Sequence, residues 1–266
     1  MRKNGVLQTW RANKATVGGW ISVDSVFTAE VMANAGFDWL CLDMQHGMLD
    51  YNDVRQMLPA ISTTNTIPFV RVPWNEPYEI MKVLDAGAYG VVVPLVNNRV
   101  EAEQAVGACR YPPGGNRSYG PVRALIYAGS DYAQEANNEI ACVVMIETRE
   151  SLENLDDIMS TPGVDGIYIG PSDLALALGL MPGTTEPEHE ETIKTILAVA
   201  KKHGIAAGIH TGSVNQSRKY LDMGFHMVTL GTDRHFMERM AKSDLAAVRG
   251  GADKEGDSDN TGDKLY

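Results

Sequence analysis

The sequence predicts a fold of the α/β class, a (β/α)8 TIM barrel. Short apolar runs rich in β-branched residues alternate with longer helix-like stretches along the chain. Such alternation produces a parallel sheet with right-handed crossovers. Eight of these units in about 230 residues fit a closed barrel better than an open sheet. The open doubly wound sheet is the alternative, but no G-x-G-x-x-G motif follows the first apolar run, where a dinucleotide-binding sheet would carry one.

The elements follow from the residues in chain order. Eight runs are expected as strands because they are apolar almost throughout, as strands buried on both faces are: residues 17–21, 39–43, 68–72, 90–94, 141–147, 166–170, 205–210 and 227–231. Amphipathic stretches are expected as helices: residues 25–35, 52–61, 77–85, 99–109, 151–160, 174–178, 190–203 and 214–223. Several of these stretches end at or near a glycine, which favours helix C-termini: Gly36, Gly87, Gly204 and Gly224.

The chain is expected to form one domain over residues 1–249, followed by a polar tail over residues 250–266. The tail is acidic and has few apolar residues, so we expect it to be mobile in isolation, although a partner subunit could order its end. Residues 111–131 form a long connection rich in glycine, proline and arginine. Long loops in compact domains are usually functional or disordered. Arg117 and Arg123 in this loop either recognise an anionic substrate tail or lie solvated.

Composition restricts the class of partner and the compartment. The 266 residues carry 23 basic and 34 acidic side chains, a formal charge of −11. This balance disfavours nucleic acid or an anionic membrane as a partner, because both need clustered Lys and Arg. No apolar run approaches the length of a membrane span, and residues 1–14 show no signal peptide, so a cytoplasmic protein is expected. Cys41, Cys109 and Cys142 lack C-x-x-C spacing, which argues against a disulfide framework or a zinc knuckle.

Two carboxylates follow the predicted strands at their carboxyl ends, which meet at one mouth of a barrel. Glu147 ends the fifth predicted strand, and Asp173 follows the sixth. Two hard oxygen ligands are too few for a complete cage, which suits Mg2+ or Mn2+, since these ions keep water and accept substrate oxygens. The alternative is structural: Glu147 caps the helix that begins near residue 151, and Asp173 lies in the first turn of its own helix.

A histidine and an arginine follow two other strand ends. His46 comes three residues after Asp43, and a histidine whose tautomer is fixed by a carboxylate can act as a general acid or base near neutral pH. A structural histidine at a turn is the alternative. Arg71 ends an apolar strand, where an unpaired buried charge is costly. It must therefore face solvent at the mouth, pair with an acid, or bind an anionic ligand.

The turn after the sixth strand is a candidate anion site. Ser172 and Asp173 open a helix after Gly170 and a proline, and the free N–H groups of a helix start attract a carboxylate or a phosphate. None of the eight predicted strands contains a lysine, whereas a Schiff-base aldolase needs one in a dry pocket. An enolate formed here would therefore need a metal for its stabilisation.

Six motifs together resemble the HpcH/HpaI aldolase family, whose members are metal-dependent class II pyruvate aldolases. They are G-F-D-W-L at 36–40, D-x-x-H at 43–46, V-R-V-P-W at 70–74, R-Y-P-P-G at 110–114, I-E-T-R at 146–149 and I-G-P-S-D-L at 169–174. They occur in the family's order, and the match covers residues 18–233, most of the chain. The resemblance implies a barrel of the phosphoenolpyruvate/pyruvate-binding type. It also implies a homo-oligomer, typically a hexamer built as a trimer of dimers, whose partners exchange the terminal helix.

The resemblance also implies a role for each matching residue. Glu147 and Asp173 would bind the divalent metal (Mg2+, Mn2+ or Co2+), which pyruvate chelates through its carboxylate and 2-oxo oxygens. Arg71 would contact the 2-oxo oxygen, and the backbone N–H groups of Ser172 and Asp173, after Gly170, would receive the pyruvate carboxylate. His46 would be the acid/base.

Two aspartates complete this expected set, and two positions depart from the family. Asp43 would orient His46, and Asp85 would reach the site of a neighbouring subunit. Gln45 stands where the family often has Glu, which changes the charge beside the histidine. His210 lies where the family's 4-hydroxy-2-oxoheptanedioate aldolase has an aliphatic residue near the aldehyde. His210 is therefore a substrate-binding candidate, and the aldehyde preference of that enzyme does not carry over to this chain.

The expected function is reversible cleavage of a 4-hydroxy-2-oxo acid to pyruvate and an aldehyde through a metal-stabilised pyruvate enolate. Stabilising the oxygen on which negative charge develops is usually the largest catalytic term. Two alternatives stay open. The same enolate would serve an oxaloacetate-type decarboxylase or an acyl-CoA lyase, although the acidic composition does not favour coenzyme A. A non-catalytic barrel that binds 2-oxo acids is the other alternative, and it would be expected to lack a metal ligand or the histidine.

Overall fold

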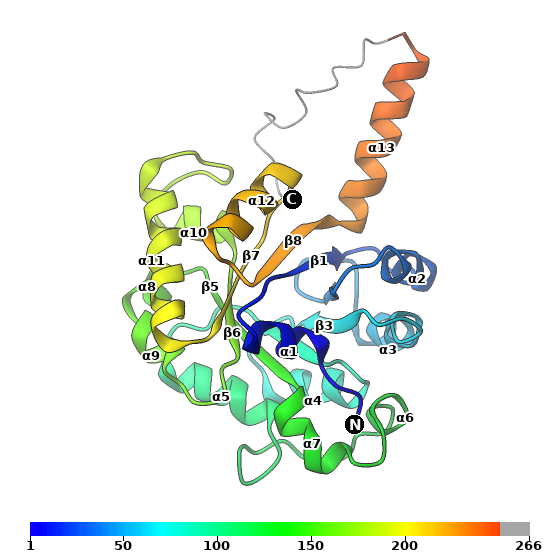
Figure 1. Cartoon of the computed structure of the whole chain (residues 1–266), viewed down its shortest axis with the longest axis vertical. Helices are drawn as coiled ribbons and strands as arrows, with labels where there is room; N and C mark the ends of the chain where they lie inside the picture. The colour runs from blue at the N-terminus through cyan, green and yellow to red at the C-terminus, as the bar shows by residue number, and fades with distance from the viewer. Residues whose placement is uncertain (251–266) are drawn as a thin grey trace.

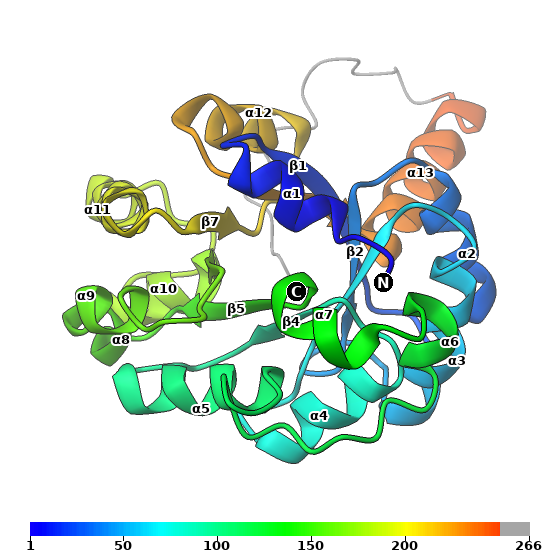
Figure 2. The ribbon, with the colours of Figure 1, turned by 60° about the horizontal axis from the view of Figure 1, so that its bottom comes forward.

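The computed structural model describes residues 1–250 and forms a closed barrel of eight parallel strands in the order β1 to β8, with β8 paired to β1 (Figures 1 and 2). The predicted (β/α)8 barrel is therefore confirmed. The strands are β1 Thr16–Ile21, β2 Trp39–Asp43, β3 Ile67–Arg71, β4 Gly90–Val93, β5 Ala141–Ile146, β6 Gly166–Ile169, β7 Ala206–Ile209 and β8 Met227–Thr232. The predicted tail lies almost wholly outside the described residues.

The helices lie outside the barrel, mostly between consecutive strands (Figure 2). They are α1 Gly5–Arg11, α2 Val26–Asn34, α3 Tyr51–Ile61, α4 Pro77–Asp85, α5 Arg99–Cys109, α6 Ala124–Ala128, α7 Tyr132–Glu139, α8 Arg149–Glu153, α9 Leu155–Met159, α10 Pro171–Ala177, α11 Pro187–His203, α12 Val214–Met223 and α13 Asp233–Val248.

The observed helices differ from prediction in five places, one of which is α11, expected from residue 190 and beginning at Pro187. The stretch 151–160 is two short helices, α8 and α9, separated at Asn154. The helix expected at 174–178 begins at Pro171, because proline suits the first position of a helix. The long loop after α5 contains α6 and leads into α7. Helices α1 and α13 extend the chain beyond the predicted alternation.

Local sequence explains where several helices begin and end. Ser25, Asn98 and Ser213 each accept a backbone N–H of the first helical turn with the side chain, as N-cap residues do. Gly204 (φ 67°) and Gly224 (φ 95°) end α11 and α12 in the left-handed conformation, which glycine adopts without a steric penalty. These caps fix where each of these helices begins or ends between two strands.

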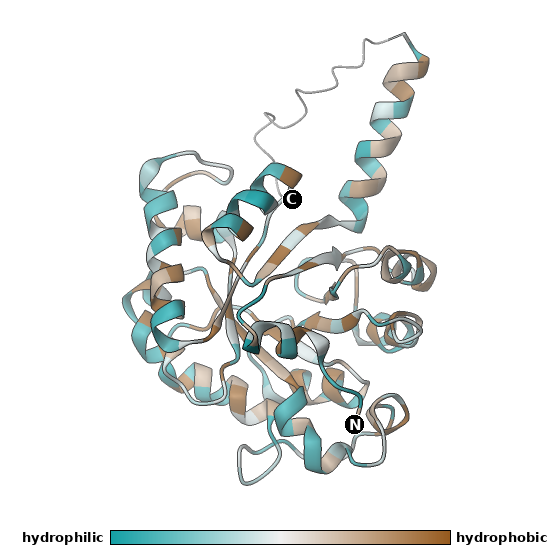
Figure 3. Ribbon diagram, in the orientation of Figure 1, coloured by the Kyte–Doolittle hydropathy of each residue, from teal (hydrophilic) through white to brown (hydrophobic). Residues whose placement is uncertain are grey.

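The core lies inside the barrel and between the strands and the helices, where the ribbon is mostly hydrophobic (Figure 3). Large aromatic side chains fill it, and neighbouring strands leave room for them. A Cβ on Gly18 would lie 2.0 Å from the Trp39 ring, so only glycine permits that ring between β1 and β2. This packing makes the strands rigid supports for the residues that follow them.

Helix α13 projects away from the barrel (Figures 1 and 2). Met237, Met240 and Leu245 on this helix are about half exposed. A mostly apolar groove of about 510 Å³ lies on the barrel wall near the start of α13, lined by Val17, Met32, Ala35, Gly36, Phe37, Asp38, Leu230 and Phe236. Among residues 1–250, no helix is long and apolar enough to cross a membrane.

Candidate active site

The predicted polar residues converge at the carboxyl ends of the strands. Asp43 ends β2, Arg71 ends β3, Glu147 directly follows β5, and His210 directly follows β7. A narrow pocket lies between them, lined by Arg71, Met145, Tyr168, Gly170, Pro171, Ser172, Asp173 and His210. Its free volume is about 10 Å³, room for about one water molecule. Any larger ligand would have to displace the surrounding side chains.

Arg71 pairs with an acid, which is one of the three alternatives that the sequence left open for it. Its side chain also lines the pocket. Its Nε donates to Asp43 Oδ1 at 2.8 Å, and its Nη2 donates to Asp43 Oδ2 at 2.7 Å. The guanidinium also lies 4.5 Å from the centre of the Trp20 ring. Burial opposes ionisation of Asp43, but Arg71 outweighs it, and the pKa of Asp43 lies below its usual value. The pair is charged and holds Arg71 in one orientation.

Asp43 also holds the turn that carries His46. Its Oδ1 accepts the backbone N–H of Gln45 at 3.1 Å and of His46 at 3.2 Å, so the His46 main chain and Arg71 share one carboxylate. The His46 side chain is exposed at the mouth. These two hydrogen bonds reach the main chain of the turn, and orientation of the His46 ring by Asp43 stays a prediction.

Glu147 and Asp173 flank Gly170. A Cβ built on Gly170 would lie 2.8 Å from Glu147 Oε2 and 3.5 Å from Asp173 Oδ2, so the missing side chain leaves a cradle beside the two carboxylates. Glu147 is buried, and its Oε1 accepts the Leu95 N–H at 2.8 Å. Burial, together with the nearby Asp173 charge, raises the pKa of Glu147 to about 7. This carboxylate is therefore poorly compensated and would gain from a cation beside Oε2.

The structural alternative, that both carboxylates serve helix starts, is wrong for Glu147 and right for the position of Asp173. Thr148, rather than Glu147, caps α8, since its side chain accepts the Ser151 N–H at 3.0 Å. Asp173 does lie in the first turn of α10. Within residues 1–250, no cluster of three or more His, Cys, Asp or Glu side chains could hold a metal ion. A cation held by the pair alone would keep positions for water or substrate.

The start of α10 presents unpaired polar groups to the same pocket. Ser172 is buried, and its Oγ has no hydrogen-bond partner among the described residues. The N–H groups of Ser172 and Asp173 lie in the first turn of the helix, where a helix supplies no acceptor for them. These groups could bind an anion that enters beside Gly170.

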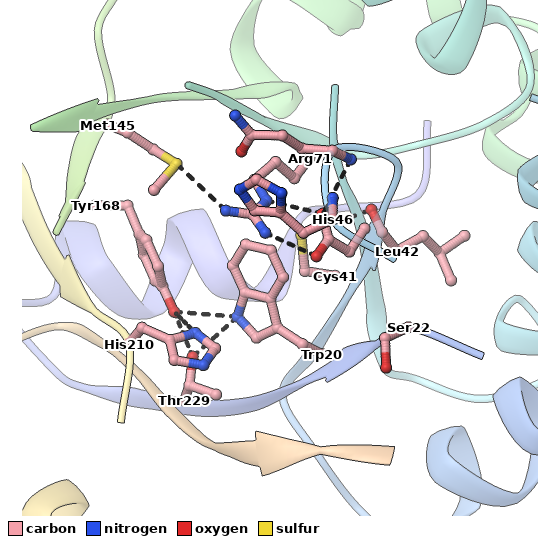
Figure 4. A network of polar contacts seen from close by, with 12 residues as sticks. Trp20, Ser22, Cys41, Leu42, His46, Arg71, Met145, Tyr168, His210 and Thr229 are labelled. Carbon is pink, nitrogen blue, oxygen red and sulfur yellow. Dashed lines mark hydrogen bonds and ion pairs between the residues drawn. The ribbon is translucent and has the colours of Figure 1, made fainter. Parts of the chain in front are cut away.

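Four polar side chains form a network at the inner wall of the pocket, and sequence reasoning identified only His210. Trp20 Nε1 lies 3.0 Å from the Tyr168 hydroxyl and 2.9 Å from Thr229 Oγ1. The Tyr168 hydroxyl also contacts Thr229 Oγ1 and lies 3.3 Å from His210 Nδ1 (Figure 4). Sequence reasoning could have identified Tyr168 and Thr229 because each is a polar residue between apolar neighbours, in β6 and β8 respectively.

The structure does not bring Asp85 into this pocket. Helix α4 leaves the mouth after β3 and ends before β4, so Asp85, its last residue, lies at the opposite end of the barrel. There its Oδ1 accepts Arg117 Nη2 at 2.7 Å. An approach of Asp85 to the site of a neighbouring subunit stays a prediction.

The two loop arginines are structural in this chain, which corrects both predictions made for them. The Arg117 side chain is fully buried and lies 4.6 Å and 5.4 Å from the ring centres of Tyr111 and Tyr132. Arg123 donates to the Ala86 carbonyl at 2.9 Å. Arg117 is buried and Arg123 is partly buried, because aromatic rings and carbonyls of the long loop and its neighbours provide partners that the linear sequence does not show.

Two further expectations agree with the described structure. The eight strands contain no lysine, so no strand supplies a Schiff-base nucleophile. Cys41, Cys109 and Cys142 are free and buried.

Comparison with known proteins places this arrangement in context. The sequence profile described as HpcH/HpaI aldolase/citrate lyase matches residues 17–239. The chain is 40% identical over 248 residues to a hydroxypyruvate/pyruvate aldolase of Rhizorhabdus wittichii, covering 92% of this chain and 99% of that protein. It is 36% identical to a 4-hydroxy-2-oxo-heptane-1,7-dioate aldolase of Escherichia coli, covering 92% of this chain and 94% of that protein.

Solved structures share the same barrel. A HpcH/HpaI aldolase/citrate lyase family protein from Burkholderia cenocepacia superposes with a TM-score of 0.88 at 35% identity, covering 93% of this chain and all of that one. The CitE protein of Mycobacterium tuberculosis, solved with magnesium and acetoacetate, has a TM-score of 0.57 at 15% identity and covers 84% of this chain and 88% of that one. The second likeness is one of fold alone.

Proposed function

The chain belongs to the HpcH/HpaI aldolase/citrate lyase family, and we propose that its pocket reversibly cleaves a 4-hydroxy-2-oxo acid to pyruvate and an aldehyde with the aid of a divalent cation. It is a carbon–carbon lyase of the aldolase type. The single observation that carries the metal dependence is the cradle at Gly170, between Glu147 Oε2 and Asp173 Oδ2. The strands offer no lysine for the covalent alternative.

The residues at the cradle fit a hard cation such as Mg2+, Mn2+ or Co2+. Glu147 and Asp173 would hold the ion, whose positive charge would offset the burial and the Asp173 charge that raise the pKa of Glu147. When bound, the cation supplies a positive charge next to the oxygen on which negative charge develops as the C3–C4 bond breaks.

The remaining groups position a 2-oxo acid and move a proton. We assign the substrate carboxylate to the N–H groups of Ser172 and Asp173, with the unpaired Ser172 Oγ beside them. Arg71 would donate to the 2-oxo oxygen, because Asp43 fixes its guanidinium at the pocket wall. His46, exposed at the mouth, would take the 4-hydroxyl proton directly or through water and return it in the aldol direction.

We further propose that the protein is a homo-oligomer in which α13 packs on a second copy. The helix carries half-exposed Met237, Met240 and Leu245, while the mostly apolar groove beside Phe37 and Phe236 is open in the single chain. The projecting helix of one copy has the length and the apolar side chains to cover such a groove on another. A hexamer, built as a trimer of dimers, is the assembly that we propose, and Asp85 would reach the neighbouring site through it.

The test is release of pyruvate from 4-hydroxy-2-oxo acids, measured with a lactate dehydrogenase couple. EDTA should abolish release, and Mg2+, Mn2+ or Co2+ should restore it. Cleavage that survives EDTA, or that borohydride traps as a covalent adduct, would contradict the proposal. Oxaloacetate is the matched comparison: if it proves a far better substrate than every hydroxy-oxo acid, the enzyme is a decarboxylase. In the aldol direction, pyruvate consumption measured with succinic semialdehyde, glycolaldehyde, lactaldehyde and tartronate semialdehyde identifies the aldehyde class.

A further inference from the structure

A buried network behind His210 determines which nitrogen of that ring carries the proton. It consists of Trp20 from β1, Tyr168 from β6 and Thr229 from β8, and it meets the ring at Nδ1 (Figure 4). Trp20, Tyr168 and Thr229 are almost completely buried. Their hydrogens must therefore find acceptors within the network, because a buried donor without an acceptor is costly.

Counting donors and acceptors leaves one arrangement that satisfies all of them. The indole N–H can only donate, and it lies within reach of both the Tyr168 hydroxyl and Thr229 Oγ1. Thr229 Oγ1 has one other partner among the described residues, the Tyr168 hydroxyl. Its hydrogen must therefore be donated to Tyr168. The Tyr168 hydrogen is then directed to the remaining neighbour, His210 Nδ1, at 3.3 Å.

The opposite arrangement leaves a group unsatisfied. If His210 donated from Nδ1, Tyr168 would have to donate to Thr229. The Thr229 hydroxyl hydrogen would then have no acceptor in a fully buried position. The network therefore favours a proton on Nε2. Nδ1 faces the Tyr168 hydroxyl in the barrel wall. Nε2 of this pocket-lining ring makes no hydrogen bond to another residue within 1–250.

We propose that His210 donates a neutral N–H from Nε2 to the substrate and thereby selects short aldehydes that carry a hydroxyl group next to the carbonyl. This inference rests on the proposed aldolase function and names its acceptor class. The ring lines the same pocket as Arg71 and Asp173, and we assign its N–H to the part of the substrate that the proposed pyruvate-binding groups leave uncovered. A neutral donor recognises a hydroxyl or carbonyl oxygen and does not require an anion.

The electrostatic surroundings agree with a neutral ring. Burial, together with the positive charge of Arg71, lowers the pKa of His210 to about 4, although Asp43 acts in the opposite direction. The imidazole is therefore uncharged at neutral pH. It cannot act as the cationic anchor for a carboxylate tail, which separates this acceptor class from dicarboxylate substrates.

Glycolaldehyde and propanal test the proposal, because they have the same number of heavy atoms and differ in the hydroxyl group. The measured quantity is the ratio of kcat/KM for glycolaldehyde to kcat/KM for propanal, each with pyruvate. His210→Leu should lower this ratio about tenfold, the usual consequence of losing one hydrogen bond to a substrate hydroxyl. His210→Gln is the matched variant, since its amide can donate from a similar position, and its ratio should stay within about threefold of the wild type.

A spectroscopic measurement tests the tautomer without any reaction. In nitrogen-15 spectra of the full-length protein at pH 7, the His210 ring, assigned by its loss in His210→Gln, should show Nδ1 as the unprotonated nitrogen and Nε2 as the protonated one. Tyr168→Phe should weaken that preference. The reverse tautomer, or a charged ring, would overturn the proposal.

The outcomes separate this inference from the proposed function. An unchanged ratio in His210→Leu, or an equal loss with both aldehydes, overturns the role of His210 while the aldolase function stands. Absence of product with every aldehyde in the metal-loaded wild type overturns the aldolase function instead. That result would also overturn the proposed aldehyde class, whichever tautomer of His210 the spectra show.

Discussion

Asp43 and Arg71 form a two-point ion pair at the wall of the pocket, with contacts of 2.8 Å and 2.7 Å between residues 28 positions apart in sequence. Both side chains are buried, with 5% exposure for Asp43 and 3% for Arg71. A planar guanidinium held at two points by a carboxylate has little rotational freedom. The pair therefore fixes the direction in which Arg71 meets a substrate.

Replacing Asp43 by Asn should cost both stability and activity. The change keeps the shape but leaves Arg71 buried without its counter-charge, and breaking a buried pair in this way costs about 3 kcal/mol of unfolding free energy. A displaced guanidinium should also lower kcat/KM about a hundredfold. Urea unfolding and the pyruvate assay measure the two effects. Glu191→Gln, which breaks the exposed pair with Lys194, is the control and should leave both unchanged.

Replacing Glu147 by Gln or Asp173 by Asn should remove cation binding. Each change takes away one of the two charged oxygens beside Gly170, and kcat/KM should fall by about a thousandfold, since the cation contributes several kcal/mol to catalysis. Titration calorimetry with Mn2+ measures the binding directly. Glu150→Gln, at an exposed position three residues along, should bind Mn2+ as the wild type does. Wild-type affinity in both site variants would show that the ion binds elsewhere.

The contribution of His210 to the stability of the fold should fall as the pH drops below about 6.5. Burial and Arg71 lower the pKa of His210 to about 4 in the folded protein, whereas a solvated histidine titrates near 6.5. Between these values the unfolded chain binds a proton that the native ring does not, so stability decreases with decreasing pH. From pH 7 to pH 5 this group should account for about 2 kcal/mol.

The contribution of His210 is obtained by difference, because other groups titrate in the same range. Urea unfolding of the wild type and of His210→Gln at pH 7 and pH 5 gives four free energies of unfolding. The pH-dependent loss should be smaller in the variant by about 2 kcal/mol. Equal losses in the two proteins would mean that His210 is not buried as a neutral ring.

Charges placed on the apolar face of α13 should weaken the proposed association between copies of the chain. Met237 and Met240 are about half exposed in the single chain, and burying a charge in an apolar groove is costly. Met237→Asp with Met240→Asp should therefore shift the mass measured by light scattering to a smaller species. Ala246→Glu, which lies on the opposite face by helical periodicity, should leave the mass unchanged. A wild-type protein that is already monomeric at micromolar concentration would refute the proposed helix packing.

The fold and the positions of most site residues could be predicted because both depend on local patterns. Apolar runs and capping residues such as Ser25 and Gly204 mark where strands and helices change. In a parallel barrel, a residue directly after a strand, such as Glu147 or His210, lies at the mouth by construction. The exact helix boundaries were less accurate where proline or asparagine alters the first or last turn, as at Pro171 and Asn154.

The sequence by itself determined the closed alternation of strands and helices, the family, and the set of side chains presented at one mouth. Tertiary structure alone decided which of them meet: that Asp43 binds Arg71, that Asp85 lies at the far end on Arg117, and that Trp20, Tyr168 and Thr229 hold one edge of His210. The physical reason is that strands buried on both faces are apolar throughout, so no alternation marks the inward-facing residues. Pairing between distant strands depends on the register and twist of the closed sheet, which no local pattern encodes.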